Sequence, residues 1–423
     1  MNHVHREDPA APPSGPAARG SGGAAAHGGR SAVGDAGLAR VGGGSASIAI
    51  ARVDAFVLRW PVAVPVRTSF GTMHDRPAVL VRVEDADGAV GWGEAWCNFP
   101  SCGAEHRVRL VETVLAPLLV GQAFASPLHA WDELTRRTAV LAIQSGEPGP
   151  IAQAIAGIDT ALHDLAARRA GLPLWRHLAA GRDGAAGPRV PVYASGINPD
   201  GPGDAVRALR EAGYTSFKLK VGFGVDRDVD NLAAVRAAAG PEAAVMVDAN
   251  QAWDFDTATV MAARLAPFGP VWLEEPLRAD RTWDEWRRLR DSIPVALAAG
   301  ENAIGDGAFA ALIASNAISV VQPDLAKWGG VSGVLGVVER IDAAGLRYCP
   351  HYLGAGIGLL ASAHLVAARG GADSVLEVDS NENPLRTLLC PPLATLQDGS
   401  IALSDAPGLG VEPDLAALRE LCR

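Results

Sequence analysis

The chain has 423 residues, a formal net charge of -10 at pH 7 and 48% hydrophobic content, which is enough to bury a large core as one barrel plus a smaller domain. A negative balance without a Lys/Arg-rich run argues against nucleic acid or an anionic membrane surface as the main partner. No uninterrupted apolar stretch reaches the ~18 residues of a membrane span. The five cysteines form no CxxC pair, which favours a reducing compartment, so we expect a cytoplasmic protein.

The first 45 residues are dominated by Gly, Ala, Pro and Arg and lack apolar periodicity. Such a segment cannot bury enough apolar surface to offset its ordering entropy, so we expect residues 1–45 to be a disordered extension. It has no apolar core of a secretory signal, and Glu7, Asp8 and Asp35 argue against a transit peptide. An unstructured extension or a misplaced start codon is therefore favoured over a targeting role.

An α+β domain is predicted over residues 46–187. Partial alternation of apolar and polar residues begins at Ile48, and an Asp-Ala-Asp-Gly turn at Asp85 separates two further strands, which indicates a small antiparallel sheet. Helical patterns follow, and Gly171 and Pro173 stop the last of them. The later strands are expected over 78–84 and 89–94, and the helices over 104–119, 127–141 and 149–170.

Eight strand-like runs alternate with helix-like segments between Val190 and Val378. This alternation predicts an α/β fold with a parallel (β/α)8 barrel over residues 188–390. The runs are short and apolar, as expected for strands buried on both faces. The tail over 391–423 resumes short strand and turn patterns, and we expect it to return to the first domain. N-terminal region and C-terminal tail would then together form a capping domain.

Residues able to carry acid, base or metal chemistry stand at the ends of seven of the eight runs. Because the carboxyl ends of all barrel strands converge on one face, these side chains should meet in one pocket. They are Lys218, Lys220, Asp248, Glu274, Glu301, Asp324, His351 and Glu377.

The two lysines, Lys218 and Lys220, lie two apart on one strand, so both leave the same face of the sheet. Burial disfavours the charged form and two close ammonium groups repel, so each is expected to lower the pKa of the other. A neutral lysine would then be available as a base near pH 7. The alternative is a surface pair whose apolar stems lie between helices. The other strand ends favour the functional interpretation.

Three carboxylates, Asp248, Glu274 and Glu301, follow on three successive strands. In one pocket they would repel strongly unless a cation lay between them, and ligands that are all oxygen favour Mg²⁺ or Mn²⁺ over zinc. Each of them alone would more often be a structural, salt-bridged carboxylate, but three at corresponding strand ends favour a metal site. Glu275 is expected to point to the other face and to be structural.

His351 follows the seventh strand and Asp324 ends the sixth, so the two can reach hydrogen-bond distance. The aspartate would fix the imidazole tautomer and raise its pKa, which makes His351 a second acid or base opposite the lysine. An ordinary loop histidine is the alternative. Glu377 closes the ring on the eighth strand and would either hold a substrate oxygen in its protonated form or pair with a lysine; the residues alone leave these two open.

Taken in order, these segments resemble the mandelate racemase group of the enolase superfamily, also called the mandelate racemase/muconate lactonizing enzyme family. The resemblance runs from Ile48 nearly to the C-terminus. One departure is His163, which stands where the family often has Trp. The resemblance rests on the lysine pair, Asp-x-Asn at Asp248, Glu-Glu-Pro at Glu274, Gly-Glu-Asn at Gly300, Pro-Asp-x-x-Lys-x-Gly-Gly at Pro323, Pro-His at Pro350, the final Glu377, Gly-Trp-Gly-Glu at Gly91 and Gly-Ile-Asp-x-Ala-Leu-x-Asp at Gly157.

The resemblance implies a role for each residue. The three carboxylates would bind Mg²⁺, which grips the carboxylate of a small-molecule substrate. Lys220 would act as the base on one face, and His351, oriented by Asp324, as acid or base on the other. Lys218 would contact the substrate carboxylate and depress the pKa of Lys220, and Glu377 would donate a hydrogen bond to the enediolate oxygen. A homo-oligomer is also implied.

These observations predict an enzyme that removes the proton next to a carboxylate, and the family resemblance favours a sugar-acid dehydratase. A racemase, epimerase or cycloisomerase is the alternative within the same group, because the intermediate can be reprotonated or rearranged instead. A non-catalytic binding protein is a third reading, but it predicts decay of the site residues, and all are present. The segments 68–74 and 96–101 mix aromatic and polar residues and are expected to set specificity, or only to pack the domain interface.

Overall fold

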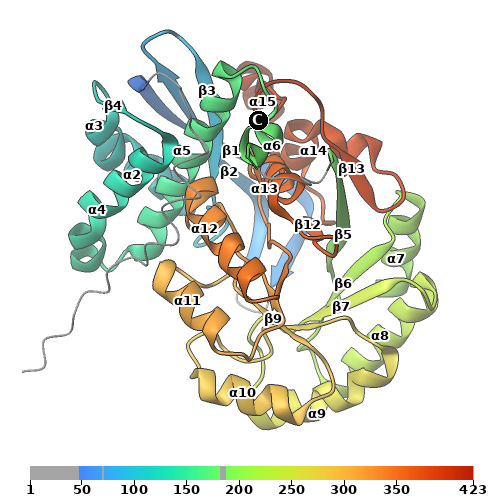
Figure 1. The fold of residues 1–423 in the computed structure, drawn as a ribbon. Coiled ribbons are helices and arrows are strands. Elements are labelled where there is room, and N and C mark those ends of the chain that lie inside the picture. The colour runs from blue at the N-terminus through green and yellow to red at the C-terminus, as the bar shows by residue number, and fades with distance from the viewer. Residues whose placement is uncertain (1–46, 69–70, 182–186, 423) are drawn as a thin grey trace, which may run out of the picture.

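The structure is a computed structural model that describes residues 47–68, 71–181 and 187–422. The extension predicted for residues 1–45 lies outside the described residues. A (β/α)8-type barrel carries an α+β domain over one end (Figure 1), which confirms the predicted fold class. Within the described ranges, no helix is both long and apolar enough to cross a membrane.

The α+β domain contains a four-stranded antiparallel sheet in the order β3-β2-β1-β4. Its two long strands form one hairpin, paired from Ile50 opposite Asp85 to Thr68 opposite Gly71. The strands are β1 (Ile48–Thr68), β2 (Gly71–Asp85), β3 (Val90–Ala95) and β4 (Ala123–Phe124). The helices are α2 (Gly103–Leu110), a π-helical turn (Val111–Leu115), α3 (Ala116–Leu119), α4 (Pro127–Ser145), α5 (Pro148–Arg169) and α6 (Leu174–Ala179).

Glycines let β3 lie directly against α5. A Cβ on Gly93 would come within 2.0 Å of the carbonyl oxygen of Gly157, and one on Gly91 within 2.0 Å of the carbonyl oxygen of Ala161. Only a residue without a side chain permits this approach of strand and helix backbones. The Gly-Trp-Gly-Glu and Gly-Ile-Asp segments therefore form one packing unit that holds the capping sheet on its helix.

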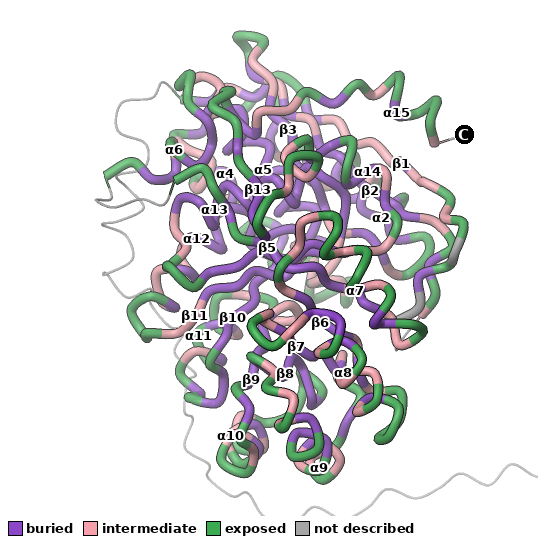
Figure 2. The backbone as a smooth tube through the Cα atoms, turned by 90° about the vertical axis from the view of Figure 1, so that its right-hand side faces the viewer, coloured by how far each residue is buried: buried purple, intermediate pink, exposed green. Residues whose placement is uncertain are grey.

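The barrel strands are parallel, and their order around the barrel is β5 to β11, with β12 closing against β5. Between β11 and β12, the backbone N–H of Glu377 donates to the carbonyl of Pro350. Figure 2 shows the strands buried, whereas the outward sides of α9 and α10 are exposed. The strands are β5 (Arg189–Ile197), β6 (Ser216–Lys220), β7 (Ala244–Asp248), β8 (Leu273–Glu274), β9 (Leu297–Ala299), β10 (Val320–Val321), β11 (Arg347–Tyr348) and β12 (Leu376–Asp379).

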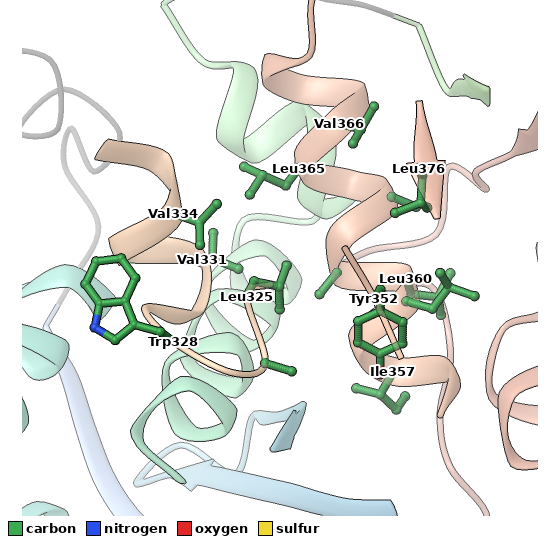
Figure 3. Close-up of a cluster of buried hydrophobic side chains, with 14 of the residues drawn as sticks. Leu325, Trp328, Val331, Val334, Tyr352, Ile357, Leu360, Leu365, Val366 and Leu376 are labelled. Atoms are coloured by element: carbon green, nitrogen blue, oxygen red, sulfur yellow. The ribbon is translucent and has the colours of Figure 1, made fainter. Parts of the chain in front are cut away.

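The surrounding helices shield the outer face of the sheet. Trp328, in the loop after β10, and Tyr352, in the loop after β11, belong to the buried core together with side chains of α12 and α13 (Figure 3). These loops are therefore anchored by a packed core. The helices are α7 (Pro202–Glu211), α8 (Val225–Ala239), α9 (Phe255–Leu265), a 3₁₀ turn (Ala266–Phe268), α10 (Trp283–Ser292), α11 (Asp306–Ala314), α12 (Gly330–Ala343), α13 (Gly356–Arg369) and α14 (Pro384–Leu389).

The C-terminal tail contacts both parts of the molecule. After a 3₁₀ turn (Pro391–Thr395), β13 (Ser400–Ala402) pairs antiparallel with barrel strand β5. Further on, Glu412 accepts a hydrogen bond from the indole of Trp92 in the capping sheet, and α15 (Leu415–Leu421) packs on β1. The division into domains at residues 46, 188 and 391 stays a prediction, since these contacts cross it.

Candidate active site

The barrel interior is apolar at one end and polar at the other because successive inward-facing residues along the strands change from apolar to polar. Tyr193, Met246 and Trp272 belong to a buried apolar layer. Two residues further along the same strands stand Ser195, Asp248 and Glu274, which point the same way and are also buried. The candidate site therefore rests on a packed apolar layer at the carboxyl ends of the strands.

Three of the predicted site residues form one row across neighbouring strands. Lys220 is paired in register with Asp248, and Asp248 with Glu274. The Nζ of Lys220 lies 2.6 Å from Oδ2 of Asp248, and the Nζ of Lys218 lies 2.6 Å from Oε1 of Glu274 and 3.6 Å from Asp248. The structure thus brings both lysines and two of the three carboxylates into direct contact.

The pKa of Lys220 differs from the sequence-based expectation. Burial is the largest effect and lowers the pKa of this ammonium group, and Lys218 lowers it further, but the carboxylates of Asp248, Glu274 and Glu377 together raise it more, so the net direction is upward. The pKa of Lys218 is raised well above its usual value in spite of burial, because Glu274 and Glu377 surround it. The expectation of a lowered lysine pKa counted burial and the repulsion between the lysines and omitted the carboxylates beside them.

Glu274 is a buried carboxylate that accepts hydrogen bonds from uncharged side chains as well as from Lys218. Its Oε2 accepts hydrogen bonds from Nε2 of Gln322 at 2.7 Å and from the indole of Trp272 at 3.2 Å. Burial, followed by the charge of Asp248, raises its pKa to about 7. Gln322 was not predicted as a site residue. The sequence could have indicated Gln322, because it lies two residues before Asp324 and is expected to face inward like it.

His351 and Asp324 lie on the opposite side of the ring from Lys220. The Nδ1 of His351 is 2.7 Å from Oδ2 of Asp324, and its Nε2 is 2.9 Å from Oε2 of Glu301. Burial lowers the pKa of the imidazole, but Glu301, Glu377 and the Asp324 hydrogen bond raise it well above its usual value. The pKa of Glu301 falls well below its usual range in spite of burial, because His351 and Lys327 are close.

Glu275 does not point away from the site as the strand pattern predicts. Its φ is 37°, so the alternation of a regular strand ends at this residue. Its carboxylate accepts from Nδ2 of Asn302, which also donates to Glu301 at 3.0 Å. Burial and the neighbouring Glu301 raise the pKa of Glu275 to about 8. Glu275 therefore belongs to the edge of the carboxylate cluster.

Two further polar residues complete the ring and were not predicted. Ser195 donates a hydrogen bond to Oε1 of Glu377, and the Nζ of Lys218 lies 2.8 Å from the same oxygen. On the other side, the Nζ of Lys327 is 2.8 Å from Oδ1 of Asn302 and lies over the ring of Trp96. Ser195 could have been found from its inward-facing place two residues after Tyr193.

The two segments expected to set specificity meet at the capping side of the barrel. Residues 71–74 belong to the end of the β1–β2 hairpin, whereas residues 69 and 70 lie outside the described residues. A Cβ on Gly71 would come within 2.7 Å of the Phe99 ring, so the hairpin and the 96–101 segment are in contact. The side-chain amide of Asn98 donates to the carbonyl of Leu353, which ties the second segment to the loop after β11.

The carboxylates fit a divalent cation by type and by position. Asp248, Glu274 and Glu301 end adjacent strands, and neighbouring strands are ~4.8 Å apart. Each faces a cationic partner: Lys220, Lys218 and His351 respectively. Among the described residues, no three His, Cys, Asp or Glu side chains are already gathered around one point in the way a bound ion requires. A bound cation would therefore have to replace these cationic side chains as the partner of the carboxylates.

Comparison with known families decides the relationship. Residues 51–178 match the mandelate racemase/muconate lactonizing enzyme N-terminal domain, and residues 203–417 match the enolase C-terminal domain-like family. The chain belongs to the mandelate racemase group of the enolase superfamily. Its curated relatives are lyases and isomerases, so this superfamily member is an enzyme of one of these classes.

Similar proteins span nearly the whole folded part of this enolase-superfamily chain. The D-galactarolactone cycloisomerase of Agrobacterium fabrum is 30% identical over 88% of the chain and 98% of the relative. The arabinonate dehydratase of Saccharolobus solfataricus is 28% identical over 80% and 88%, respectively. A solved mandelate racemase/muconate lactonizing enzyme from Bordetella bronchiseptica superposes with a TM-score of 0.84 at 61% identity, covering 89% of this chain and 100% of its own. A racemase from Streptomyces coelicolor, solved with bound magnesium, gives 0.76 at 28% identity, covering 88% and 99%.

Proposed function

We propose that this enzyme removes the α-proton of a carboxylate substrate with the help of Mg²⁺ and then expels a β-hydroxyl, that is, it dehydrates a sugar acid. The observation that carries the proposal is the placement of two acid/base groups on opposite sides of one carboxylate-lined pocket. Lys220 stands at the end of β6, and the buried His351–Asp324 pair stands beyond β10 and β11.

Asp248, Glu274 and Glu301 would hold the Mg²⁺. The chemistry that the ion supplies there is neutralisation of the negative charge that grows on the substrate carboxylate as the α-proton leaves. The proposal is supported by the donor set, by the raised pKa of Glu274 and by the magnesium bound in the Streptomyces coelicolor relative. Mg²⁺ prefers oxygen ligands of this kind.

Lys220 takes the α-proton on its Nζ. It must be neutral to do so, and the contact with Asp248 that raises its pKa is the contact that a bound cation would weaken. Lys218 lies between Glu274 and Glu377, deep in the pocket, where its ammonium group can receive the substrate carboxylate. Glu377 accepts a hydrogen bond from the hydroxyl of Ser195 and lies beside Lys218, so it would face the same substrate carboxylate.

His351 donates the second proton. Its Nδ1 is held by Asp324, so its Nε2 is the atom that faces the pocket. In the dehydration, the carbanion electrons form a C–C double bond, the β C–O bond breaks, and the Nε2 proton leaves with the hydroxyl as water. The enol product then becomes a 2-keto acid. The similarity to an arabinonate dehydratase supports this outcome.

A screen of acids in deuterated water tests the proposal. The metal-loaded enzyme is incubated with sugar acids, amino acids and aryl acids, and exchange of the α-hydrogen and formation of a 2-keto acid are followed together. A dehydratase gives exchange and a keto acid with sugar acids. Exchange of the α-hydrogen with recovery of the substrate or its stereoisomer would identify a racemase. Formation of a ring-opened or ring-closed isomer would identify a cycloisomerase. Absence of exchange with every acid would contradict the proposal.

A further inference from the structure

Arg76 is a fully buried cation of the capping domain that reaches the mouth of the barrel. It lies on β2, only 1% exposed, and its Nη2 is 2.5 Å from Oδ2 of Asp379 at the end of barrel strand β12. Among the described residues, its Nε and Nη1 atoms have no hydrogen-bond partner. A guanidinium group has five N–H donors, so most of its hydrogen-bonding capacity is unused.

The charges around Arg76 do not balance. Asp379 receives a second guanidinium, that of Arg386 on α14, whose Nη1 lies 3.5 Å from the same carboxylate oxygen. Two cations thus share one anion in a place where both are buried. Burial of an unpaired charge is costly unless an anion accompanies it. The excess positive charge and the free N–H groups both indicate that an anionic ligand binds here.

The position of Asp379 relates Arg76 to the candidate active site. Asp379 is two residues beyond Glu377 on β12, so both side chains point into the barrel, and Asp379 stands about 7 Å nearer the mouth. Its partner in register is Ser195, whose hydroxyl is bonded to Glu377. A chain of about six carbons, with C–C bonds of ~1.5 Å, spans this distance. One molecule can therefore reach Lys218 with one end and Arg76 with the other.

We propose that Arg76 binds the distal carboxylate of a dicarboxylic substrate, so that this enzyme prefers sugar diacids to sugar acids with a single carboxylate. The proposal rests on the proposed function and narrows its substrate class. A hydroxyl at the far end of the substrate could also accept hydrogen bonds from the N–H groups of Arg76, but it would leave the excess positive charge uncompensated. Planar, doubly accepting carboxylates are the ligands that a guanidinium group matches best.

Matched substrate pairs test the proposal. Each six-carbon sugar diacid is compared with the monoacid of the same configuration in which the distal carboxylate is replaced by a hydroxymethyl group. The expected result is a kcat/KM at least 100-fold higher for the diacid of the pair that the wild-type enzyme uses. Arg76→Met should remove most of this preference and leave the monoacid value within a few fold. Equal use of both acids by the wild-type enzyme would overturn the proposal.

Two variants separate substrate binding from a purely structural role. Arg82→Met makes the same change on the same strand, at a partly exposed residue paired with Asp54 and Glu84, and should keep the diacid preference. Arg76→Met/Asp379→Asn avoids a buried, partly unpaired carboxylate and should still lack the preference. If Arg76→Met reduced activity on diacid and monoacid alike, and the double variant restored the preference, Arg76 would be only a tie between the domains.

A binding measurement keeps the inference independent of turnover. Adipate has two carboxylates and no hydroxyl to expel, and hexanoate lacks the distal carboxylate. Calorimetric titration of the magnesium-loaded wild-type enzyme should give at least tenfold tighter binding of adipate, and Arg76→Met should abolish the difference. If no acid exchanges its α-hydrogen but adipate still binds through Arg76, the proposed reaction fails and the anion site stands. Equal binding of both acids by the wild-type enzyme would remove the anion site.

Discussion

Asp324 and His351 form a buried pair in which Oδ2 of the aspartate lies 2.7 Å from Nδ1 of the histidine. The other oxygen of Asp324 accepts the backbone N–H groups of Ala326 and Lys327 at the start of the next loop. The carboxylate is therefore fixed by the backbone, and it fixes the imidazole in turn, so that Nε2 faces the pocket.

Asp324→Asn should lower kcat by roughly 100-fold to 10,000-fold, with little change in KM, because an amide no longer selects the tautomer that presents Nε2 as the proton donor. The asparagine carbonyl can still accept the two backbone N–H groups, so the loop should be preserved. The pKa of His351, measured by NMR titration, should fall relative to the wild type, since the hydrogen bond to a carboxylate raises it. An unchanged kcat and an unchanged His351 pKa would show that Asp324 does not position the histidine.

Lys220→Ala and His351→Asn should divide the reaction into its two halves. The lysine variant should lose both turnover and exchange of the α-hydrogen with deuterated water, because it lacks the group that takes the proton. The histidine variant should lose turnover but keep exchange, since enolisation can precede departure of the hydroxyl. Exchange is followed by NMR or mass spectrometry. Loss of exchange in the histidine variant, with retention in the lysine variant, would reverse the two roles.

Glu274→Gln should weaken Mg²⁺ binding at least tenfold and abolish turnover, because it removes one charge from a site of three carboxylates. The fold should survive, since Lys218 keeps its contact with Glu377 at 2.8 Å. Glu275→Gln is the matched control: the amide oxygen can still accept from Asn302, and Mg²⁺ binding should change much less. Affinity is measured by calorimetric titration. Full activity after removal of metal with EDTA would contradict the metal site.

The site residues could be predicted from the sequence because strand alternation places them. Asp248 and Glu377 each stand two residues after an apolar residue of the buried layer, Met246 and Val375, and the parallel barrel brings such strand ends together. The same periodicity would have found Ser195 and Gln322 if every inward-facing polar residue had been considered, including those that carry no charge.

Other features depend on three-dimensional contacts that periodicity does not describe. Glu275 turns toward the cluster because of its φ of 37°, and the pattern of residue types along the chain does not predict this backbone conformation. The direction of the Lys220 pKa depends on a 2.6 Å contact with Asp248 on the next strand, so the neighbouring lysine alone gave the wrong sign. The Arg76–Asp379 pair joins residues 303 positions apart and could not be inferred from either segment.

His364 should make the fold sensitive to acid. Its Nδ1 accepts the backbone N–H of Trp175 at 3.0 Å, so the ring must stay neutral, and burial lowers its pKa from 6.5 to about 4. Between these values the unfolded chain binds a proton that the folded chain does not, so stability falls as the pH falls from 6.5 to 4. A shift of this size corresponds to roughly 3 kcal/mol of unfolding free energy.

The source of this acid sensitivity can be isolated with His364→Asn. The asparagine Oδ1 can accept the same N–H but does not titrate, so urea unfolding at pH 7, 5.5 and 4.5 should give a smaller loss of stability than in the wild type. His74→Asn, at an exposed histidine, should keep the wild-type loss. Other buried groups titrate identically in the wild type and in His364→Asn. The difference between the two proteins in how steeply unfolding free energy falls with pH is therefore due to His364. Identical slopes in wild type and His364→Asn would assign the acid sensitivity to other groups, of which His163, with a pKa lowered to about 3 by burial, is the next to replace.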